Sequence, residues 1–282
     1  MRTFAFLGLT VALSVLLGCR SGRCPSQAPC GEVGVPKRIT LVTYNIGNSA
    51  PKKYGVQKPF NLPGAGALLK RLKADFVALQ EVDKFVGRGG NPSRDTAGDL
   101  AKEAGFPYAL FGKAIPLRRG EYGVALLCRE KPTTWEVVKY PPSREQRVFI
   151  DARFRMVDGK TLAVICTHFD LSAAARKAQV EALLAHLKAK PADRVLLAGD
   201  LNASFGDNEL KPLFGEMSAL TPCPEVFTCF GVSKAIDHVF ARALPGERWV
   251  ALPASRRVEY GEQAPLSDHF PVFVEAELTS AQ

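Results

Sequence analysis

Residues 199–202 read GDLN, and they directly follow the apolar run at 195–198. A second polar string, SDH at 267–269, comes just before the alternating apolar run at 271–274. Such runs are typical of buried strands, so two strands each carry a carboxylate and a second polar group at one end. Metal-assisted cleavage of a phosphate ester needs an oxygen ligand for a divalent cation, a donor for the phosphoryl oxygen and a histidine that moves a proton. The two strings therefore indicate this class of chemistry.

Outward from these segments, short β-type runs alternate with a few helical ones. The sequence predicts strands at 39–44, 76–80, 123–128, 135–140, 148–154, 161–167, 195–198, 236–240, 248–252 and 271–277, and helices at 65–73, 96–104 and 173–188. In the last helix, apolar residues recur at helical spacing, so one face should pack on a sheet. Many strands and few helices in one continuous pattern favour an α+β sandwich of two sheets covered by helices.

Polar residues recur at the ends of the predicted strands. Strand packing has no use for such groups, so their repetition suggests that they converge on one concave site. Taken singly, each has a plainer explanation, such as a turn at Asn45 or Asn202, a surface charge at Glu81 or a cap at Asp237. The set comprises Asn45, Glu81, His168, Asp200, Asn202, Asp237, Asp268 and His269.

Seven strings in order carry a family resemblance. They are TYNIG (43–47), LQEVD (79–83), EYGVALLCR (121–129), CTHFD (166–170), GDLN (199–202), IDHVF (236–240) and SDHFPV (267–272). Together they resemble the endonuclease/exonuclease/phosphatase superfamily over residues 37–278. The resemblance implies a four-layer αββα sandwich, with two mixed β-sheets flanked by helices, as in pancreatic deoxyribonuclease.

The resemblance also implies a metal site and its cofactor. Glu81 is placed like the principal Mg²⁺ ligand of the family, and Asn45 and Asp268 like residues that help to position the metal and its waters. Mg²⁺ or Mn²⁺ is therefore the expected cofactor.

Catalytic roles follow from the same resemblance. Asp200 matches the residue that orients or deprotonates the attacking water, and Asn202 the donor to the phosphoryl oxygen. His269 resembles the general acid or base, and Asp237 the residue that holds its ring. His168 matches a second active-site histidine that binds phosphate or protonates the leaving group.

Other positions have weaker signals. Arg147 resembles a family position that contacts phosphate, and Tyr122 is expected to line the pocket. His186 is interpreted as structural or solvated, and His238 should point to the opposite face of its strand from Asp237. The pair Arg176 and Gln179 matches a family pattern of structural purpose.

The reaction is expected to be in-line attack of water on a phosphodiester, and the substrate remains open. A nuclease or broad phosphodiesterase is favoured by the basic charge balance and by basic residues in the predicted loops, namely Lys52, Lys53, Lys58, Arg88, Arg94, Arg118 and Arg119. A phospholipid, sphingomyelin-type or small-molecule phosphodiesterase or phosphatase is the alternative, supported by the N-terminal anchor. An inactive surface binding lipoprotein is the third, disfavoured because no expected catalytic position is substituted. Phosphate esters, with nucleic acid among them, are the expected partners of a monomeric enzyme.

The N-terminus resembles a bacterial lipoprotein signal. A basic start at Arg2 and an apolar stretch too short to span a bilayer precede Cys19, the expected lipidation site. The alternative is an ordinary secretory signal cut near the same cysteine. Residues 1–18 are thus expected to be a signal peptide, 19–36 a flexible tether and 37–282 the catalytic domain. The protein should be exported and lipid-anchored, on the periplasmic face of a membrane or at the cell surface.

Charge and cysteine content agree with an exported protein acting on anions. Without the signal the chain has 36 basic and 28 acidic residues, a net charge of +8 that favours an anionic substrate or surface, or serves solubility alone. Export implies an oxidising compartment, so the close pairs Cys24 with Cys30 and Cys223 with Cys229 are expected disulfides. Cys128 and Cys166 lie in strand-like runs and are expected to be buried, inert thiols.

Overall fold

The computed structural model describes residues 34–47, 59–222, 224–260 and 265–281. The expected signal peptide, Cys19 and most of the tether lie outside these ranges. Ordered pairing begins at Val35, which bridges to Met156. No helix within the described ranges is long and apolar enough to cross a membrane.

Two mixed sheets form the centre of the domain. The first has the order β11 (Glu247–Ala251), β13 (Val272–Ser280), β1 (Arg38–Asn45), β2 (Phe76–Lys84), β4 (Gly120–Cys128) and β3 (Tyr108–Leu117), with β12 (Arg256–Arg257) paired to β13. The second has the order β5 (Thr134–Lys139), β6 (Val148–Arg155), β7 (Thr161–His168), β8 (Arg194–Asp200), β10 (Asp237–Arg242) and β9 (Ser218–Ala219). The pairs β1–β2 and β7–β8 are parallel and the others antiparallel.

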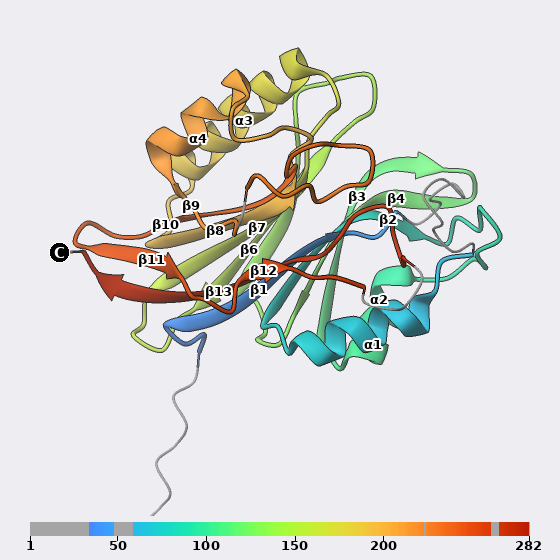
Figure 1. Cartoon of the computed structure of the whole chain (residues 1–282), viewed down its shortest axis with the longest axis horizontal. Coiled ribbons are helices and arrows are strands. Elements are labelled where there is room, and N and C mark those ends of the chain that lie inside the picture. Colours follow the sequence, from blue (N-terminus) through green and yellow to red (C-terminus); the bar gives the residue numbers. More distant parts are fainter. Residues whose placement is uncertain (1–33, 48–58, 223, 261–264, 282) are drawn as a thin grey trace, which may run out of the picture. The chain divides into compact units, whose positions relative to one another are not determined.

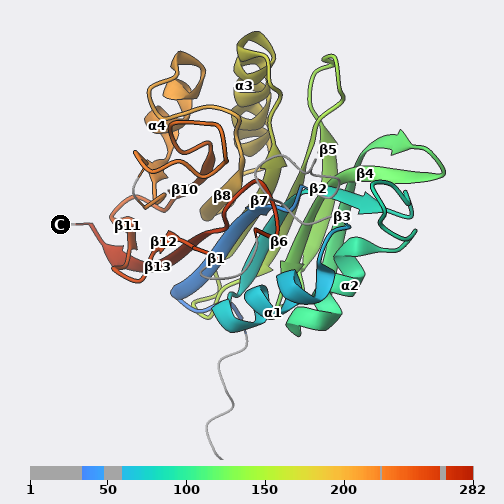
Figure 2. The same cartoon turned by 45° about the vertical axis from the view of Figure 1, so that its right-hand side comes forward.

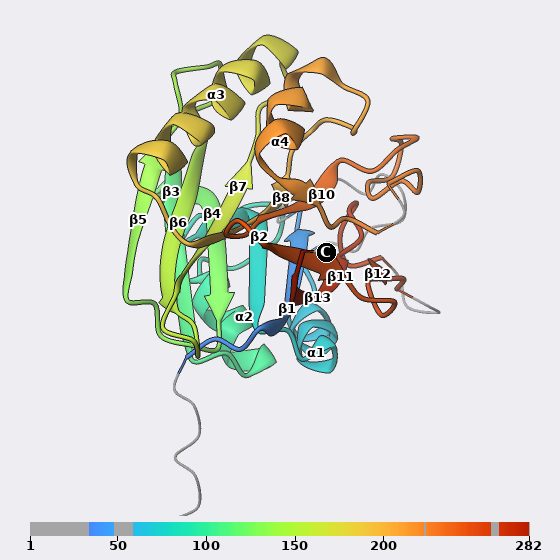
Figure 3. The same ribbon diagram turned by 90° about the vertical axis from the view of Figure 1, so that its left-hand side faces the viewer.

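Helices cover the outer faces of both sheets. Helices α1 (Leu62–Leu72) and α2 (Thr96–Ala104) pack side by side on the first sheet, as Figures 1 and 2 show. Helix α3 (Ala173–Ala189), the 3₁₀ helix η2 (Asn208–Leu210) and α4 (Lys211–Glu216) cover the second sheet (Figure 3). One apolar cluster fills the space between the sheets and one lies under each helical layer. The predicted αββα sandwich is therefore confirmed.

Local sequence signals explain where the first two helices begin and end. The side chains of Asn61 and Asp95 each accept a hydrogen bond from a backbone N–H of the first helical turn. These caps satisfy donors that have no partner inside a helix. Gly105 ends α2 in a left-handed conformation that glycine adopts without strain.

The sequence did not predict strand β3 or helix α4. Strand β3 lies at the edge of the first sheet, is only partly buried, and contains Gly112 and Pro116, so it lacks the apolar run that marked the other strands. Helix α4 has six residues, too few to show a helical period.

The topology brings several strand ends to one edge of the sandwich. Strands β1 and β2 run in the same direction, as do β7 and β8. Asn45, His168 and Asp200 therefore end their strands at this edge of the sandwich. Strand β10 runs antiparallel to β8 and therefore begins there, with Asp237 opposite Asp200. Loops at this edge carry Arg147, Asn202, Asp268 and His269, whereas Glu81 lies in β2 and Tyr122 in β4.

Candidate active site

The second sheet presents three site residues in one row. His168 is paired with Asp200 across β7 and β8, and Asp200 with Asp237 across β8 and β10. Close approach of β7 and β8 depends on Gly199, because a Cβ there would lie 2.2 Å from the carbonyl oxygen of Thr167. The backbone register thus places an imidazole and two carboxylates side by side.

The first sheet contributes Asn45 and Glu81. Glu81 lies at an irregularity in the β2–β4 pairing and has a φ of 58°, so its side chain leaves the strand ladder and turns toward the site. The amide nitrogen of Asn45 donates to Glu81 Oε1 at 3.2 Å and to Asp200 Oδ2 at 3.0 Å. Asn45 therefore links the two sheets, because it donates to one carboxylate of the first sheet and one of the second.

The segment before β13 supplies Asp268 and His269. His269 Nδ1 lies 2.9 Å from Asp237 Oδ2, and its Nε2 lies 3.7 Å from Asp200 Oδ2. The hydroxyl of Ser267 donates to the carbonyl oxygen of Asn45 at 2.7 Å, and that of Tyr260 donates to the carbonyl oxygen of His269. These two hydrogen bonds fix the backbone conformation around Asp268 and His269.

Asn202 and Arg147 complete the cluster around His168. Asn202 has a φ of 49°, and its amide nitrogen donates to the carbonyl oxygen of Phe169 at 3.0 Å and lies 3.2 Å from His168 Nε2. Arg147 Nη1 lies 3.0 Å from His168 Nδ1. Tyr122 lines one small cavity with Arg147 and His168, and its ring lies under the guanidinium of Arg88.

Burial and neighbouring charges shift the pKa values of this cluster. Burial, with the charge of Asp237, raises the pKa of Asp200 to about 7, and burial also raises that of Glu81. Burial and then Arg147 lower the pKa of His168 well below its ordinary value. Burial alone would lower the pKa of His269 too, but the carboxylates of Asp237 and Asp200 raise it well above its ordinary value. One histidine is therefore held neutral and the other charged.

The charge balance of the cluster fits a divalent cation. Four carboxylates, those of Glu81, Asp200, Asp237 and Asp268, face the guanidinium of Arg147 and the imidazolium of His269. With all four carboxylates ionised, two negative charges are in excess, and burial raises the pKa values of Glu81 and Asp200. Buried Asp237 Oδ1 also has no hydrogen-bond partner within the part of the chain that the structure describes. Carboxylate oxygens are ligands that Mg²⁺ prefers, and Glu81 and Asp268 are not committed to a basic side chain.

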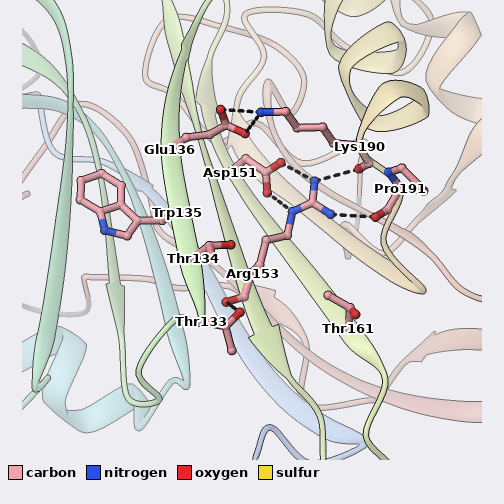
Figure 4. A pocket seen from close by; sticks show the side chains of 9 residues that line it. All are labelled: Thr133, Thr134, Trp135, Glu136, Asp151, Arg153, Thr161, Lys190 and Pro191. Carbon is pink, nitrogen blue, oxygen red and sulfur yellow. Dashed lines mark hydrogen bonds and ion pairs between the residues drawn. The ribbon is translucent and has the colours of Figure 1, made fainter.

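Another acidic and histidine cluster lies on the outer face of the second sheet, beside a cavity shown in Figure 4. Asp151 is bound by Arg153 and by His186 Nε2, the latter at 2.8 Å, and Lys190 pairs with Glu136. Arg153 also donates to the carbonyl oxygens of Lys190 and Pro191, beyond the end of α3. Every charged group of this cluster has an opposite partner, so it fastens α3 to β6.

The other predictions have mixed outcomes. His238 Nε2 donates to the carbonyl oxygen of Ala203 at 2.9 Å, and its ring stacks on Phe205, which confirms that it points away from Asp237. The predicted disulfide of Cys229 with Cys223 is wrong, because Cys229 is a free buried thiol directed toward its own segment. The backbone bridge from Cys229 to His269 holds that thiol beside the imidazole. Cys24, Cys30 and Cys223 lie outside the described residues. Cys128 and Cys166 are buried free thiols, as predicted.

Some supporting contacts were not predicted, although Asp170 ends the CTHFD string and Ser267 begins the SDHFPV string. Asp170 lies three residues after Thr167 in the sequence. Its carboxylate accepts hydrogen bonds from Ser143 Oγ and from the backbone N–H of Ser172, both at 2.8 Å. Its own N–H donates to Gln179 Oε1 at 2.9 Å. The hydroxyls of Tyr260 and Ser267 donate to backbone carbonyls, and they also contact the hydroxyl of Tyr44 and the N–H of His269, respectively. A sequence shows no signal for such contacts.

Comparison with known proteins places this geometry in a family. The model of the Endonuclease/Exonuclease/phosphatase family matches residues 42–269. No curated protein sequence shows a significant match. The fold is similar to an endonuclease/exonuclease/phosphatase from Beutenbergia cavernae, with a TM-score of 0.67, 21% identity, and coverage of 86% of this chain and 72% of that one. It is also similar to the mannosyl-6-phosphatase Bt3783 of Bacteroides thetaiotaomicron, with a TM-score of 0.62, 18% identity, and coverage of 84% and 99%. A third similar structure is ANGEL2, described as a 2′,3′-cyclic phosphatase, with a TM-score of 0.63, 14% identity, and coverage of 86% and 95%.

Proposed function

This chain belongs to the endonuclease/exonuclease/phosphatase family, a family of phosphoesterases, and we propose that it hydrolyses phosphodiester bonds with a divalent cation. The observation that carries the proposal is the convergence of Glu81, Asp200 and His269 at one edge of the sandwich, linked through Asn45. A metal-binding carboxylate, a base and an acid within one contact network are the groups that this hydrolysis requires.

Each site residue has its own role in the proposed hydrolysis. Glu81 and Asp268 hold Mg²⁺ or Mn²⁺, which neutralises phosphate charge and stabilises the leaving oxygen when bound. Asp200, with a pKa of about 7, orients the attacking water and accepts its proton. The amide of Asn202 donates to the phosphoryl oxygen. His269, kept charged by Asp237, delivers a proton to the leaving group.

Local charge favours a diester over a monoester. Arg147 is the one arginine or lysine in hydrogen-bond contact with the cluster of described site residues. Together with one divalent cation it suits a substrate with a single negative charge, whereas a monoester near neutral pH carries close to two. Nucleic acid fits this charge, and the exposed Arg118 and Arg119 lie on the β3–β4 turn, where Arg118 donates to the carbonyl oxygen of Gly87 in the loop after β2.

A lipid phosphodiester is the second candidate, and exposed apolar side chains favour it. Phe85 is 50% exposed four residues after Glu81, and Leu171 is 75% exposed three residues after His168. Such residues on loops beside a catalytic cleft can contact acyl chains. Small phosphate esters are a third class of candidate substrate, because two similar structures are named as a mannosyl-6-phosphatase and a 2′,3′-cyclic phosphatase.

A substrate panel tests these options. Purified protein is incubated with Mg²⁺ and, in parallel, plasmid DNA, RNA, sphingomyelin vesicles, bis-p-nitrophenyl phosphate and p-nitrophenyl phosphate. We expect hydrolysis of diesters that EDTA abolishes and Mg²⁺ restores. Loss of activity in Asp200→Ala, with activity retained in the exposed α3 control Lys177→Ala, assigns it to the cluster. Activity on the monoester alone, or activity unaffected by EDTA, would refute the proposal.

We also propose that the protein is exported and lipid-anchored through Cys19. The charged start, short apolar stretch and following cysteine support this proposal. Expression of wild type and Cys19→Ala in a Gram-negative host, followed by membrane fractionation and mass spectrometry of the mature N-terminus, provides the test. A wild-type N-terminus without lipid would contradict it.

A further inference from the structure

The two active-site histidines have opposite partners at Nδ1. His269 Nδ1 faces the carboxylate of Asp237 at 2.9 Å, whereas His168 Nδ1 faces the guanidinium of Arg147 at 3.0 Å. Both rings direct Nε2 at the same atom, Asp200 Oδ2, at 3.7 Å and 3.5 Å. The two imidazoles thus flank one carboxylate almost symmetrically, but with Nδ1 environments of opposite charge.

A guanidinium can only donate hydrogen bonds, and it stays protonated in proteins. When Arg147 Nη1 donates to His168 Nδ1, that nitrogen must present its lone pair, and a neutral ring must then carry its proton on Nε2. The opposite arrangement holds at His269, where the carboxylate of Asp237 accepts and Nδ1 must carry a proton.

We propose that Arg147 is a positioning residue that fixes His168 in its Nε2–H tautomer, so that the ring acts as a hydrogen-bond donor toward Asp200. This inference rests on the proposed function, because it gives His168 a part in holding the carboxylate that orients the water. It also assigns proton delivery to His269 alone. His168, expected from the family resemblance to bind phosphate or to protonate the leaving group, serves as a fixed donor.

Nε2 of His168 faces both a donor and an acceptor. Asn202 Nδ2 donates one N–H to the carbonyl oxygen of Phe169, and its second N–H faces His168 Nε2 at 3.2 Å. This neutral amide competes with the guanidinium of Arg147 at Nδ1, and the shorter, charge-assisted contact of Arg147 decides the tautomer. Asp200 Oδ2 is then the acceptor that Nε2–H faces, and at 3.5 Å the attraction is mainly electrostatic. Asp200 Oδ2 also accepts from Asn45, so a donor at His168 adds a second fixed dipole toward the same oxygen.

Arg147 is built into this position. Its side chain is 8% exposed, and Nη2 lies 3.3 Å from Glu145 Oε1 at the rim. Buried Nε has no partner among the described residues. A guanidinium held this firmly beside a single imidazole loses little freedom in making the bond, which suits a role in orientation.

Nuclear magnetic resonance of ¹⁵N-histidine-labelled protein tests the proposal without turnover. The chain has four histidines, and His168→Gln assigns the signal of interest. In wild type we expect a directly bonded proton on Nε2 of His168 and none on Nδ1. The pattern should persist in Arg147→Lys and become a mixture of tautomers in Arg147→Met. The matched control is Arg144→Met, an exposed arginine of the same loop, which should leave the spectrum unchanged.

The kinetics separate positioning from phosphate binding. If Arg147 acts through His168, Arg147→Met lowers kcat at least tenfold with little change in KM, and Arg147→Lys recovers most of the loss. A proton on Nδ1 of His168 in wild type overturns the proposal, and this single spectrum is decisive even if Arg147→Met fails to fold. A rise in KM with the tautomer unchanged in Arg147→Met also overturns it. Because the tautomer is read in the resting protein, an enzyme inactive on every phosphodiester would contradict the proposed function and leave this result intact.

Discussion

Two site residues, Glu81 and Asn202, hold left-handed backbone conformations that side chains other than glycine rarely adopt. Both lie at a strand end or bulge, and both direct a polar group into the cluster. Strain of this kind persists where surrounding structure imposes it, and it occurs often at functional sites. The local geometry of these two residues is therefore arranged for the site at some expense of stability.

Replacement of Glu81 by Gln should separate stability from activity. Burial raises the pKa of Glu81, so in the metal-free wild type its ionisation destabilises the fold as pH rises from the unfolded pKa through the folded one. Glu81→Gln should therefore be more stable than wild type in EDTA at pH 8 and similar to it below pH 4, as measured by urea unfolding.

The same variant should lose several orders of magnitude in turnover, and Mg²⁺ should raise the melting temperature of wild type only. Equal stabilisation of both proteins by Mg²⁺ would show that Glu81 is not a ligand.

Replacement of Asp237 by Asn should shift the pH dependence of the reaction. The carboxylate of Asp237 helps to raise the pKa of His269, so its loss should lower that pKa. If charged His269 is the acid, the alkaline limb of the kcat–pH profile should move to lower pH, and kcat should fall by roughly 10²–10⁴-fold. An unchanged alkaline limb would assign that ionisation to another group.

Motif residues were predictable as a set. Each has a plainer explanation taken singly, but carboxylates, amides and imidazoles that recur at strand ends have no packing role. The partners of these residues were not predictable. The contact of Arg147 with His168 depends on how β6 and β7 pair, and the hydroxyl of Ser267 reaches the backbone carbonyl of Asn45, far away in the chain. The hydroxyl of Tyr260 reaches the backbone carbonyl of His269, nine residues later in the chain. Such contacts arise only from the tertiary fold.

At the scale of elements, the pairing of β7 and β8 depends on one glycine. A Cβ at residue 199 would meet the carbonyl oxygen of Thr167 at 2.2 Å, so Gly199→Ala must push the strands apart next to His168 and Asp200. We expect a loss of about 2–4 kcal/mol in the free energy of unfolding and a strong loss of activity.

Gly215→Ala in α4 is the matched control for that change. A Cβ there meets nothing within 4 Å, so this variant should be neutral or more stable by about 0.5–1 kcal/mol. Urea unfolding of both variants makes the comparison. Equal stabilities would contradict the described packing of β7 on β8.

The prediction of helices and strands succeeded for segments with a clear apolar pattern and failed for segments without one. The buried strand β8 and the long helix α3 follow their patterns closely. The exposed edge strand β3 and the six-residue α4 have no pattern to detect, although tertiary packing stabilises both.

At the scale of the whole molecule, a buried arginine joins the two sheets. Arg194 of β8 is 1% exposed and pairs with Asp158 and with Glu247 of β11, at 2.8 and 2.7 Å. Hydrogen bonds from Arg194 lower the pKa of both carboxylates. The pairs therefore contribute stability that is complete above the unfolded pKa values, near 4, and is lost as pH falls through the lowered folded ones.

Arg194→Met should thus lose about 1–3 kcal/mol of unfolding free energy at pH 7, with a smaller difference from wild type at pH 3. Arg248→Met, an exposed neighbour of Glu247 on β11, should change little at either pH. Chemical unfolding at the two pH values gives the answer, and a difference that grows on acidification would contradict the description of this network.

We propose that side chains from both sheets gather around one divalent cation at the open edge of the sandwich. Anomalous diffraction from crystals soaked in Mn²⁺ tests this proposal most directly. We expect a Mn²⁺ peak contacted by Glu81 and Asp268 that disappears in Glu81→Gln. In an active protein at saturating Mn²⁺, the absence of a peak between these carboxylates would contradict it.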